Sequence, residues 1–520
     1  MTAVKTNEKK FQELQARRLE AEAMGGPEKV ERHHQRGKLT ARERVNLLLD
    51  PNTFQEYGKL ATHQGQKPGE PTTPADALVA GFGCIHGRPV CLYAEDATLF
   101  GGSLSDVNFN KRLRTIALAT RERIPLIMLL DGAGFRAQSM LHAVEGSPAI
   151  GHTLALAQAS GSAPTIGVVM GACAGESALN AALAEYTIMV KGTGMIAAGG
   201  PPVVKASTGV DISKEDLGGT SIHADITGMI DNVVDSDEEA IIAVKRLLSF
   251  LPTNAWSYPP SSKPRSAKTG ASYSINHILP DNPKSPYDIK DVIDCIVDED
   301  SFFETKGRFG QSLVTGLARL QGHPVGIIAN QPKVFAGALS AAAAQKARKF
   351  IDCCSAYHIP IVSLADTPGV MTGPASEKEG SLKFGLGAAY AMAWANVPVF
   401  SVILRKAFGF GGALMAGSSG PQTVALAWPT ADFSSLPPDS AIEAAHKKEL
   451  DAAEDPEALY AQLMEQYQTF GGPYPAAGIL NIDDVVAPDE TRARLIQALE
   501  SSMARRTEQP SPTQRYGVMP

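Results

Sequence analysis

An internal repeat is the feature that most constrains how this chain can fold. The segment "GFGCIHGRPVCLYAEDATLFGGSLS" is matched by "GLARLQGHPVGIIANQPKVFAGALS", which places Gly81 and Gly316 at positions 235 apart (316 − 81 = 235). The same offset relates further pairs: Gly87 and Gly322, Pro89 and Pro324, Phe100 and Phe335, Pro125 and Pro360, Asp131 and Asp366, and Gly134 and Gly369. Because chance matches would not keep one offset over so long a stretch, the sequence predicts two copies of one fold.

The length of 520 residues also suits two domains of ordinary size. The repeat continues with small gaps, since Pro164 matches Pro398 and Pro201 matches Pro437, and we place a two-residue insertion within "AFGFGGALM". A stretch rich in Pro, Ser and Lys that starts at Leu251 predicts the connection between the copies. We therefore expect an N-terminal helix (1–26), a first domain (27–255), a linker (256–274), a second domain (275–505) and a frayed tail (506–520).

Each copy alternates short apolar runs with helical stretches. In the first copy, "RPVCLYAED" predicts a strand, residues 111–123 a helix, "IPLIMLLDGAG" a second strand, and "APTIGVVMG" a third strand that leads into a helix from Gly175. Continuously apolar strands that alternate with helices are typical of a largely parallel sheet covered by helices. The predicted fold class is therefore α/β.

Composition narrows the range of functions. A net charge of −7 and a pI near 5.9 argue against nucleic acid or an anionic membrane surface as partner. No apolar run approaches the roughly 20 residues of a membrane span, and the charged N-terminus lacks the apolar core of a signal peptide. The six cysteines show no C-x-x-C spacing, so we expect reduced thiols, no zinc site and a cytoplasmic protein. His33 and His34 lie on a charged helix and are expected to be solvated.

The candidate site consists of glycine-containing turns at the carboxyl ends of strands, where ligands collect in α/β folds. The turns are "DGAGFR" (131–136) and "GACAGES" (171–177) in the first copy, and "DTPGVMTG" (366–373) and "RKAFGFGGALM" (405–415) in the second. Glycine permits close approach of the backbone to a ligand, and a helix start offers free N–H groups. Paired and repeated turns favour a site for an oxyanion, such as a thioester enolate, over turns that serve packing alone. The sequence contains no G-x-S-x-G, Walker or H-E-x-x-H motif.

Several longer motifs resemble one family. "HHQRGKLTARERVNLLLDPNTFQEYG" (33–58) is similar to the N-terminal signature of the carboxyltransferase subunits of biotin-dependent acyl-CoA carboxylases, such as the propionyl-CoA and methylcrotonyl-CoA carboxylase β subunits. Further matches are "FGGSLS", "PYDIKDVIDCIVDEDSFFETK", "GIIANQP", "DTPG", "VILRKAFG" and "AWPTADF". The resemblance covers about Gly25 to Arg506 and implies two tandem crotonase-like domains, which agrees with the repeat.

The resemblance also implies a reaction and partners. An acyl-CoA would bind mainly on the first domain and carboxybiotin on the second, and backbone oxyanion holes would hold the enolate, without a side-chain base or a metal. The chain lacks an Ala-Met-Lys-Met biotinylation motif, so a separate biotin carboxylase and biotin carrier protein would be required, and a homohexamer is expected. The implied catalytic residues are Gly175, Glu176, Gly411 and Gly412, and the implied substrate-binding residues are Ala133, Gly134, Phe135, Arg136, Gly409 and Ala413.

Three departures from the family pattern leave alternatives open. In one of them, "AGAL" is followed by Ser340 and alanines in place of the family's acidic residues. The family commonly has Gly-Gly where this chain has Gly175-Glu176, and Ser-Gly-Gly-Ala-Arg where it has Gly132 to Arg136. Glu176 could be a carboxylate in the first turn of a helix, favoured by the helix dipole and directed to solvent. It could instead be a general acid or base in a biotin-independent acyl-CoA hydratase, isomerase, hydrolase or decarboxylase. A non-catalytic scaffold subunit is the third hypothesis.

Overall fold

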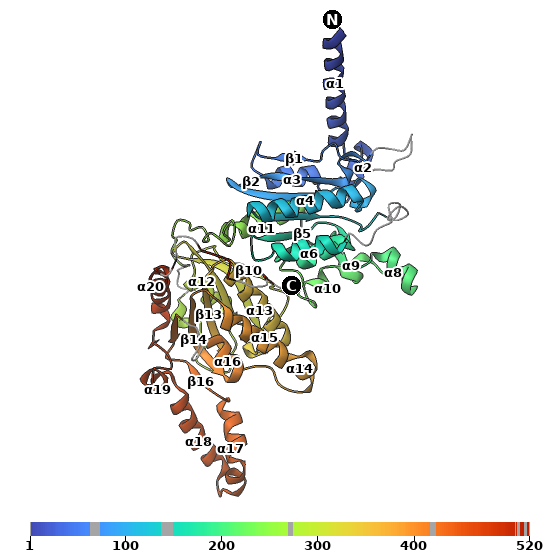
Figure 1. The fold of residues 1–520 in the computed structure, drawn as a ribbon. Helices are drawn as coiled ribbons and strands as arrows, with labels where there is room; N and C mark the ends of the chain where they lie inside the picture. Colours follow the sequence, from blue (N-terminus) through green and yellow to red (C-terminus); the bar gives the residue numbers. More distant parts are fainter. Residues whose placement is uncertain are drawn as a thin grey trace. The chain divides into compact units, whose positions relative to one another are not determined.

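The computed structural model describes residues 2–62, 73–136, 149–268, 274–416, 423–504, 506, 510–513 and 517–518. The chain forms two compact units (Figure 1). Unit 1 comprises Met1–Ser257 and Gln514–Pro520, and unit 2 comprises Tyr258–Thr513. Within the described ranges, every helix is too short or too polar to cross a lipid bilayer. All six cysteines lie in the described ranges, and none of them forms a disulfide bond.

Unit 1 alternates strands and helices as its sequence predicts. Its helices are α1 (Thr2–Glu22), α2 (Pro27–His34), α3 (Ala41–Leu48), α4 (Asp106–Glu122), α6 (Ala149–Ala159), α7 (Glu176–Leu183), α8 (Pro201–Thr208), α9 (Lys214–Gly218), α10 (Thr220–His223) and α11 (Asp237–Phe250). Its strands are β1 (Gln55–Tyr57), β2 (Leu78–Ile85), β3 (Arg88–Glu95), β4 (Leu126–Leu130), β5 (Thr165–Val169), β6 (Ala172–Ala174), β7 (Tyr186–Val190), β8 (Met195–Ala197) and β9 (Asn232–Val234). The strands expected at 88–96, 124–134 and 163–171 are confirmed as β3, β4 and β5.

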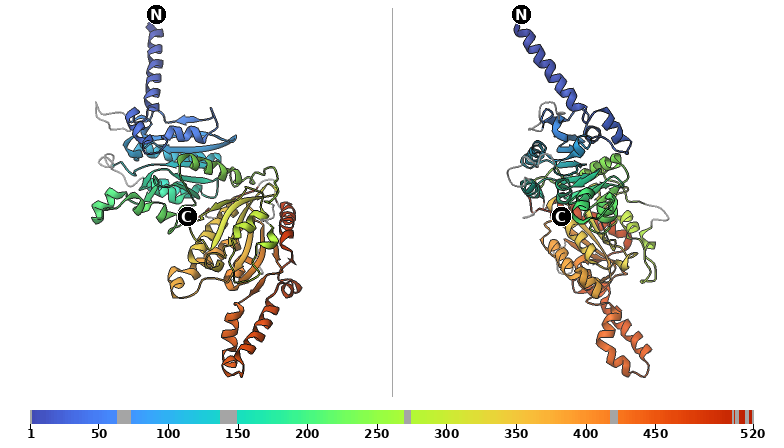
Figure 2. Two further views of the ribbon diagram at one scale, coloured as in Figure 1. Left: turned by 180° about the vertical axis from the view of Figure 1, so that it is seen from behind. Right: turned by 90° about the vertical axis from the view of Figure 1, so that its right-hand side faces the viewer.

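The described part of unit 1 contains a seven-stranded sheet in the order β1-β2-β3-β4-β5-β7-β9. The pairs β1–β2 and β2–β3 are antiparallel, and the remaining neighbours are parallel. Helices α4, α6 and α7 pack on one face around an apolar core that includes Tyr93, Met128 and Leu156. Helices α3 and α11 contact each other on the other face. Figure 2 shows that α1 extends away from this layered body.

Unit 2 repeats this architecture. Its helices are α12 (Ile289–Ile296), α13 (Ala341–Ala356), α14 (Pro374–Glu379), α15 (Ser381–Trp394), α16 (Gly409–Ala416), α17 (Pro438–Ala452), α18 (Pro456–Gly471), α19 (Pro473–Gly478) and α20 (Thr491–Met503). Its strands are β10 (Phe303–Thr305), β11 (Leu313–Leu320), β12 (His323–Asn330), β13 (Ile361–Thr367), β14 (Val399–Phe408), β15 (Val424–Ala427), β16 (Asp432–Ser434) and β17 (Asp484–Val485). Helices α17 and α18 form a hairpin that projects from the unit (Figures 1 and 2).

The sheet of unit 2 has the order β10-β11-β12-β13-β14-β15-β17, and β16 pairs with β14. Helices α13 and α15 pack together on one face, and α12 and α20 enclose the core on the other. The antiparallel pair β11–β12 has the register of β2–β3, because Gly81 pairs with Leu92 as Gly316 pairs with Ile327. The structure therefore contains the repeat that the sequence predicts.

The position predicted for the insertion is wrong. Ala174 ends the short strand β6 before Gly175, as Phe408 ends β14 before Gly409, and the helices that follow are both eight residues long. The offset changes only after these helices, since Tyr186 pairs with Ile166 whereas Val424 pairs with Phe400. The insertion thus lies between α16 and β15, beyond "AFGFGGALM". Gly175 corresponds to Gly409, and Glu176 corresponds to Phe410.

The last described residues also differ from the expected frayed tail. Val518 is buried, and its N–H donates a 3.0 Å hydrogen bond to the Ser160 hydroxyl. A side chain on Gly517 would lie 2.7 Å from the Ser160 carbonyl oxygen, so the backbone is packed closely at this point. This short segment is therefore part of unit 1.

Candidate active site

The two glycine turns of the first copy lie against each other in unit 1. Gly134 follows β4 with a φ of +89°, and a Cβ there would lie 2.9 Å from the carbonyl oxygen of Ala174. Gly175 follows β6 with a φ of +55°, and its Cβ would lie 3.6 Å from the Cα of Gly134. L-residues rarely adopt such φ values, and no side chain fits between the two strands of backbone at Gly134. The close contact therefore depends on glycine.

The "FGGSLS" segment (100–105) holds the first turn in place. The amide of Ala133 donates to the Gly101 carbonyl at 2.9 Å, and the amide of Leu104 donates to the Gly134 carbonyl at 2.7 Å. The amide of Arg136 returns a hydrogen bond to the Leu104 carbonyl at 2.7 Å. A motif quoted for the family resemblance thus acts as a backbone clamp on the turn.

Three backbone amides at this junction make no hydrogen bond to another described residue. Among the described residues, no acceptor is bonded to the N–H groups of Gly134, Phe135 or Glu176. Glu176 begins α7, and the first N–H groups of a helix have no partner inside it and carry a positive partial charge. The junction can therefore donate to an anionic oxygen.

Unit 2 has the equivalent junction. Gly369 has a φ of +121° and Gly409 a φ of +57°, and the amide of Leu339 donates to the Gly369 carbonyl at 2.9 Å. A Cβ on Gly411 would lie 2.7 Å from the carbonyl carbon of Gly369, so α16 packs directly on this turn. A cavity of about 470 Å³ opens beside it and is lined by Gly409, Phe410, Gly412, Ala413, Phe433 and neighbouring residues.

Unit 1 has a cavity of about 460 Å³ beside its own junction. Its lining includes Gly101 and Ala133 together with basic side chains from distant parts of the unit. The basic residues are Arg36 and Lys38, which follow α2, and Lys214 at the start of α9, and His33 of α2 also lines the cavity. Arg36 and Lys214 are exposed, so their charges face solvent at the cavity. The cavity suits an anionic ligand that extends from the turn toward solvent.

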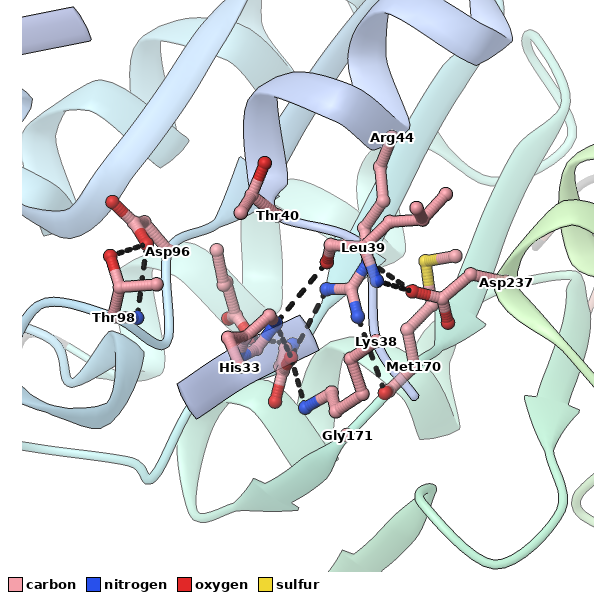
Figure 3. A network of polar contacts seen from close by, with 12 residues as sticks. His33, Lys38, Leu39, Thr40, Arg44, Asp96, Thr98, Met170, Gly171 and Asp237 are labelled. Carbon is pink, nitrogen blue, oxygen red and sulfur yellow. Dashed lines mark hydrogen bonds and ion pairs between the residues drawn. The ribbon is translucent and has the colours of Figure 1, made fainter. Parts of the chain in front are cut away.

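A buried network supports this cavity (Figure 3). Asp131 is paired with Lys38 and with Arg44, whose Nη1 lies 3.1 Å from the carboxylate, and Arg44 also bonds Asp237 at 2.8 Å. Burial by itself raises the pKa of Asp131, but the Arg44 and Lys38 charges outweigh it and lower the pKa. The aspartate that follows β4 is therefore held as an anion by residues of the N-terminal signature.

The expectation that His33 is solvated is wrong. His33 is buried, its Nε2 lies 3.2 Å from the Leu39 carbonyl oxygen, and it lies 3.8 Å from Asp131. Burial, reinforced by the nearby Lys38 charge, lowers the pKa of His33 to about 4. His33 is consequently neutral near pH 7. His34 remains partly exposed and contacts Glu43.

Comparison with known proteins agrees with this geometry. Residues 32–516 match the model of the carboxyl transferase domain family. The chain belongs to this family. It is 38% identical over 518 residues to the propionyl-CoA carboxylase carboxyltransferase subunit of Haloferax mediterranei, covering 99% of this chain and 100% of that protein. It is 36% identical to the methylmalonyl-CoA carboxyltransferase 12S subunit of Propionibacterium freudenreichii subsp. shermanii, covering 99% and 98%.

A solved carboxyltransferase has nearly the same structure. The crystal structure of transcarboxylase 12S, reported as a hexamer assembly with methylmalonyl-CoA and methylmalonic acid bound, superposes with a TM-score of 0.91 at 35% identity. The match covers 98% of each chain. The tandem crotonase-like fold and the family recognised in the sequence are thereby confirmed.

The expected solvent-directed position of Glu176 in this carboxyltransferase is wrong. The side chain of Glu176 is buried, and its Oε1 bonds Nδ1 of His152 on α6. Glu176 does not line the described cavity of unit 1. The amide of Glu176 therefore belongs to the junction, whereas its carboxylate belongs to the helix packing behind it.

The remaining predicted residues divide in the same way. Arg136 is buried, and its guanidinium donates to Asp76 at 2.9 Å and to the Ser103 carbonyl at 3.1 Å, so its contacts hold the turn. Phe135 is 37% exposed next to these contacts. A role of either side chain in substrate binding stays a prediction. Gly409, Gly412 and Ala413 line the cavity of unit 2, whereas Gly411 packs on Gly369.

Sequence reasoning missed four side chains near the junctions: His152, Arg36, Lys38 and Lys214. The motif "HHQRGK" offered a signal for Arg36 and Lys38, because it stood at the head of the quoted family signature. No spacing rule connects Lys214 or His152 with the glycine turns. These two residues reach the site only through the packing of α9 and α6.

Proposed function

We propose that this chain is the carboxyltransferase component of an acyl-CoA carboxylase. It would move a carboxyl group from carboxybiotin on a separate carrier protein to the α-carbon, or a vinylogous carbon, of an acyl-CoA. The observation that carries the proposal is the pair of equivalent glycine junctions, each placed where a strand ends and a helix begins. Amides in fixed positions stabilise an anion that forms during a reaction, without a cost of reorientation.

Unit 1 is proposed to bind the acyl-CoA. The amides of Gly134, Phe135 and Glu176 can donate to the thioester oxygen as it becomes an enolate oxygen. The adjoining cavity carries the exposed cations Arg36 and Lys214, which match the phosphate charges of coenzyme A. The amides of the junction would thus bind the thioester oxygen of the substrate, and Arg36 and Lys214 would bind the phosphates of its coenzyme A part.

Unit 2 is proposed to receive the biotin ring. Its cavity is lined by Gly409, Gly412, Ala413, two phenylalanines and polar residues such as Ser434 and Asn481. This described lining is mixed in polarity and uncharged, and it fits a neutral ring that carries one polar ureido group. The first amides of α16 have no partner inside the helix and can donate to the ureido oxygen. Biotin supplies the carboxyl group as CO2 and, at the ureido nitrogen, a base for the α-proton. The chain itself positions both partners and stabilises their oxygens.

A reconstituted assay tests the proposal. The purified chain is combined with a biotin carboxylase, a biotin carrier protein, ATP, labelled bicarbonate and an acyl-CoA. Label should enter the acyl-CoA only when every component is present. Turnover of an acyl-CoA by the chain alone, lost in Glu176→Gln, would contradict the proposal and favour a biotin-independent enzyme. If the chain shows neither turnover nor CoA binding, the hypothesis of a non-catalytic scaffold subunit is favoured.

Assembly is proposed to follow the 12S subunit, whose structure is described as a hexamer. Light scattering of the purified chain should then give about six times the chain mass of 55.0 kDa. A monomer or dimer at working concentration would contradict this part of the proposal.

A further inference from the structure

Glu176 and His152 form a buried polar pair directly behind the proposed thioester site. Glu176 is the first residue of α7, and its carboxylate oxygen Oε1 contacts Nδ1 of His152 in the first turn of α6. The relative exposure of the side chains is 4% for Glu176 and 0% for His152. A polar contact so deeply buried is costly to lose, because each group would be left without a partner.

One buried cation lies near the pair but makes its ion pair elsewhere. Arg112 on α4 lies 2.6 Å from Glu95 on β3, both side chains are fully buried, and the Arg112 charge also interacts with Glu176. The Ser177 hydroxyl also donates to Glu95, at 2.5 Å. Among the described residues, neither Oε2 of Glu176 nor Nε2 of His152 has a hydrogen-bond partner. The contact between the two side chains is therefore the polar tie that joins the start of α7 to α6.

The backbone before Glu176 has a conformation that requires glycine. Gly175 adopts a φ of +55° and a ψ of −121°, a conformation open to glycine, and its own amide is tied to the Ala197 and Ala198 carbonyls at 3.2 and 3.1 Å. The chain is thus fixed before the glycine and, through Ser177, after Glu176. The Gly175 carbonyl, which shares a peptide plane with the Glu176 N–H, accepts the Leu179 N–H at 3.0 Å, so the helix holds one side of this peptide and the Glu176 side chain holds the other.

We propose that the Glu176–His152 pair positions the Glu176 amide for the enolate oxygen of the acyl-CoA. This inference rests on the proposed function of unit 1. Since the amide and the carboxylate belong to one residue, anchoring the carboxylate on α6 fixes the N–H without placing the side chain in the ligand cavity. Glu176 and His152 are positioning residues, and neither touches the substrate.

The second copy supports a role specific to the acyl-CoA site. Phe410 is the counterpart of Glu176, and it is 39% exposed and lines the cavity of unit 2. Unit 2 therefore has no equivalent carboxylate anchor at this position. A purely structural requirement of the fold would apply to both copies, whereas this pair is present where the proposed reaction generates an enolate.

The effect of losing the anchor should appear in binding of the enolate and hardly in binding of the ground state. An oxyanion-hole donor is worth roughly 100- to 1,000-fold, and a donor that is displaced rather than removed should lose about 10- to 100-fold. Loss of an interaction that is made only with the enolate lowers kcat and leaves KM unchanged.

Two CoA derivatives test this with the chain alone. One carries a nitronate in place of the enolate, and the other is the matching thioether without an oxygen at that position. Glu176→Ala and His152→Ala should weaken nitronate binding about 10- to 100-fold by calorimetry and leave thioether binding within about twofold. His152→Asn keeps a nitrogen near the position of Nδ1 and should restore most of the nitronate affinity.

Tyr93→Phe is the matched control. It removes the hydroxyl that accepts a 2.9 Å hydrogen bond from Asn180, one turn further along α7. Equal loss of nitronate affinity in Tyr93→Phe would show general loosening of α7 and overturn the positioning role. Unchanged nitronate affinity in Glu176→Ala would also overturn it. If the wild-type chain binds neither derivative, the proposed acyl-CoA site itself fails, and the role of the pair fails with it.

Discussion

Replacing Gly134 by alanine tests the oxyanion junction of unit 1 most directly. The new Cβ would lie 2.9 Å from the carbonyl oxygen of Ala174 and 3.3 Å from its carbonyl carbon, at a φ of +89°. These neighbours are backbone atoms, so the contact can be relieved only by moving Ala174 and with it Gly175. An alanine held at this φ costs about 1–3 kcal/mol, and displacement of one donor lowers kcat/KM roughly 100-fold or more.

Gly209→Ala provides the control for backbone strain alone. Gly209 ends α8 with a φ of +76°, and its added Cβ would meet no atom within 4 Å. Both variants should lose stability in thermal unfolding, whereas only Gly134→Ala should lose carboxyl transfer in the reconstituted assay. A folded Gly134→Ala protein that is as active as Gly209→Ala would refute the assignment of the junction to the reacting thioester.

Three further predictions concern other parts of the chain. Gly369→Ala, with its Cβ 3.2 Å from the Phe408 carbonyl oxygen, should abolish transfer from carboxybiotin and leave CoA binding to unit 1 intact in titration calorimetry. Arg36→Gln and Lys214→Gln should each raise the KM for acyl-CoA roughly fivefold, reduce its salt dependence and leave kcat unchanged, as expected for exposed charges; an equal effect on a substrate without the nucleotide part would contradict a phosphate contact. Burial lowers the pKa of Lys346 from 10.5 to about 7. Between these pH values the unfolded chain binds a proton at Lys346 that the folded chain does not bind. The free energy of unfolding therefore increases with pH across this range, by up to about 5 kcal/mol. Denaturant unfolding across this window should show a shallower rise for Lys346→Met.

The sequence was sufficient for the architecture because its signals are local or repeated. The strand ending in "IPLIMLLDG" is continuously apolar, and the offset of 235 between Gly81 and Gly316 relates two hairpins of the same register. The glycine turns could be located because positive φ values and close backbone contacts at Gly134 and Gly369 require this residue type. Each of these requirements selects glycine at one position, so it is visible in the sequence without knowledge of the residues that lie nearby in the fold.

The side chains around the turns were harder to place because their surroundings are made by distant elements. His33 belongs to a charged helix, yet it is buried against Leu39 and Asp131, which lie in different parts of unit 1. Glu176 has the features of an exposed helix-start carboxylate, and only the packing of α6 supplies His152. The local sequence predicts the surroundings that a residue would have on an isolated helix. In the folded unit, packing against distant elements replaces those surroundings.

Each copy has a buried aspartate at the equivalent position, but different residues neutralise its charge. This difference explains why the two cavities have different linings. In unit 2, Asp366 is bound by Arg405 at 3.0 Å and Lys406 at 2.9 Å, both from β14. In unit 1 the counterpart of Arg405 is Gly171, where a Cβ would lie 1.7 Å from Asp131 and 2.5 Å from the Lys38 nitrogen. The absent side chain leaves room for Lys38 and Arg44 to serve Asp131 instead. Because these cations come from the N-terminal segment, that segment packs against Asp131, and its residue Arg36 lines the cavity. Unit 2 supplies its cations from within its own sheet, and the described lining of its cavity contains no charged side chain, so this cavity suits a different ligand.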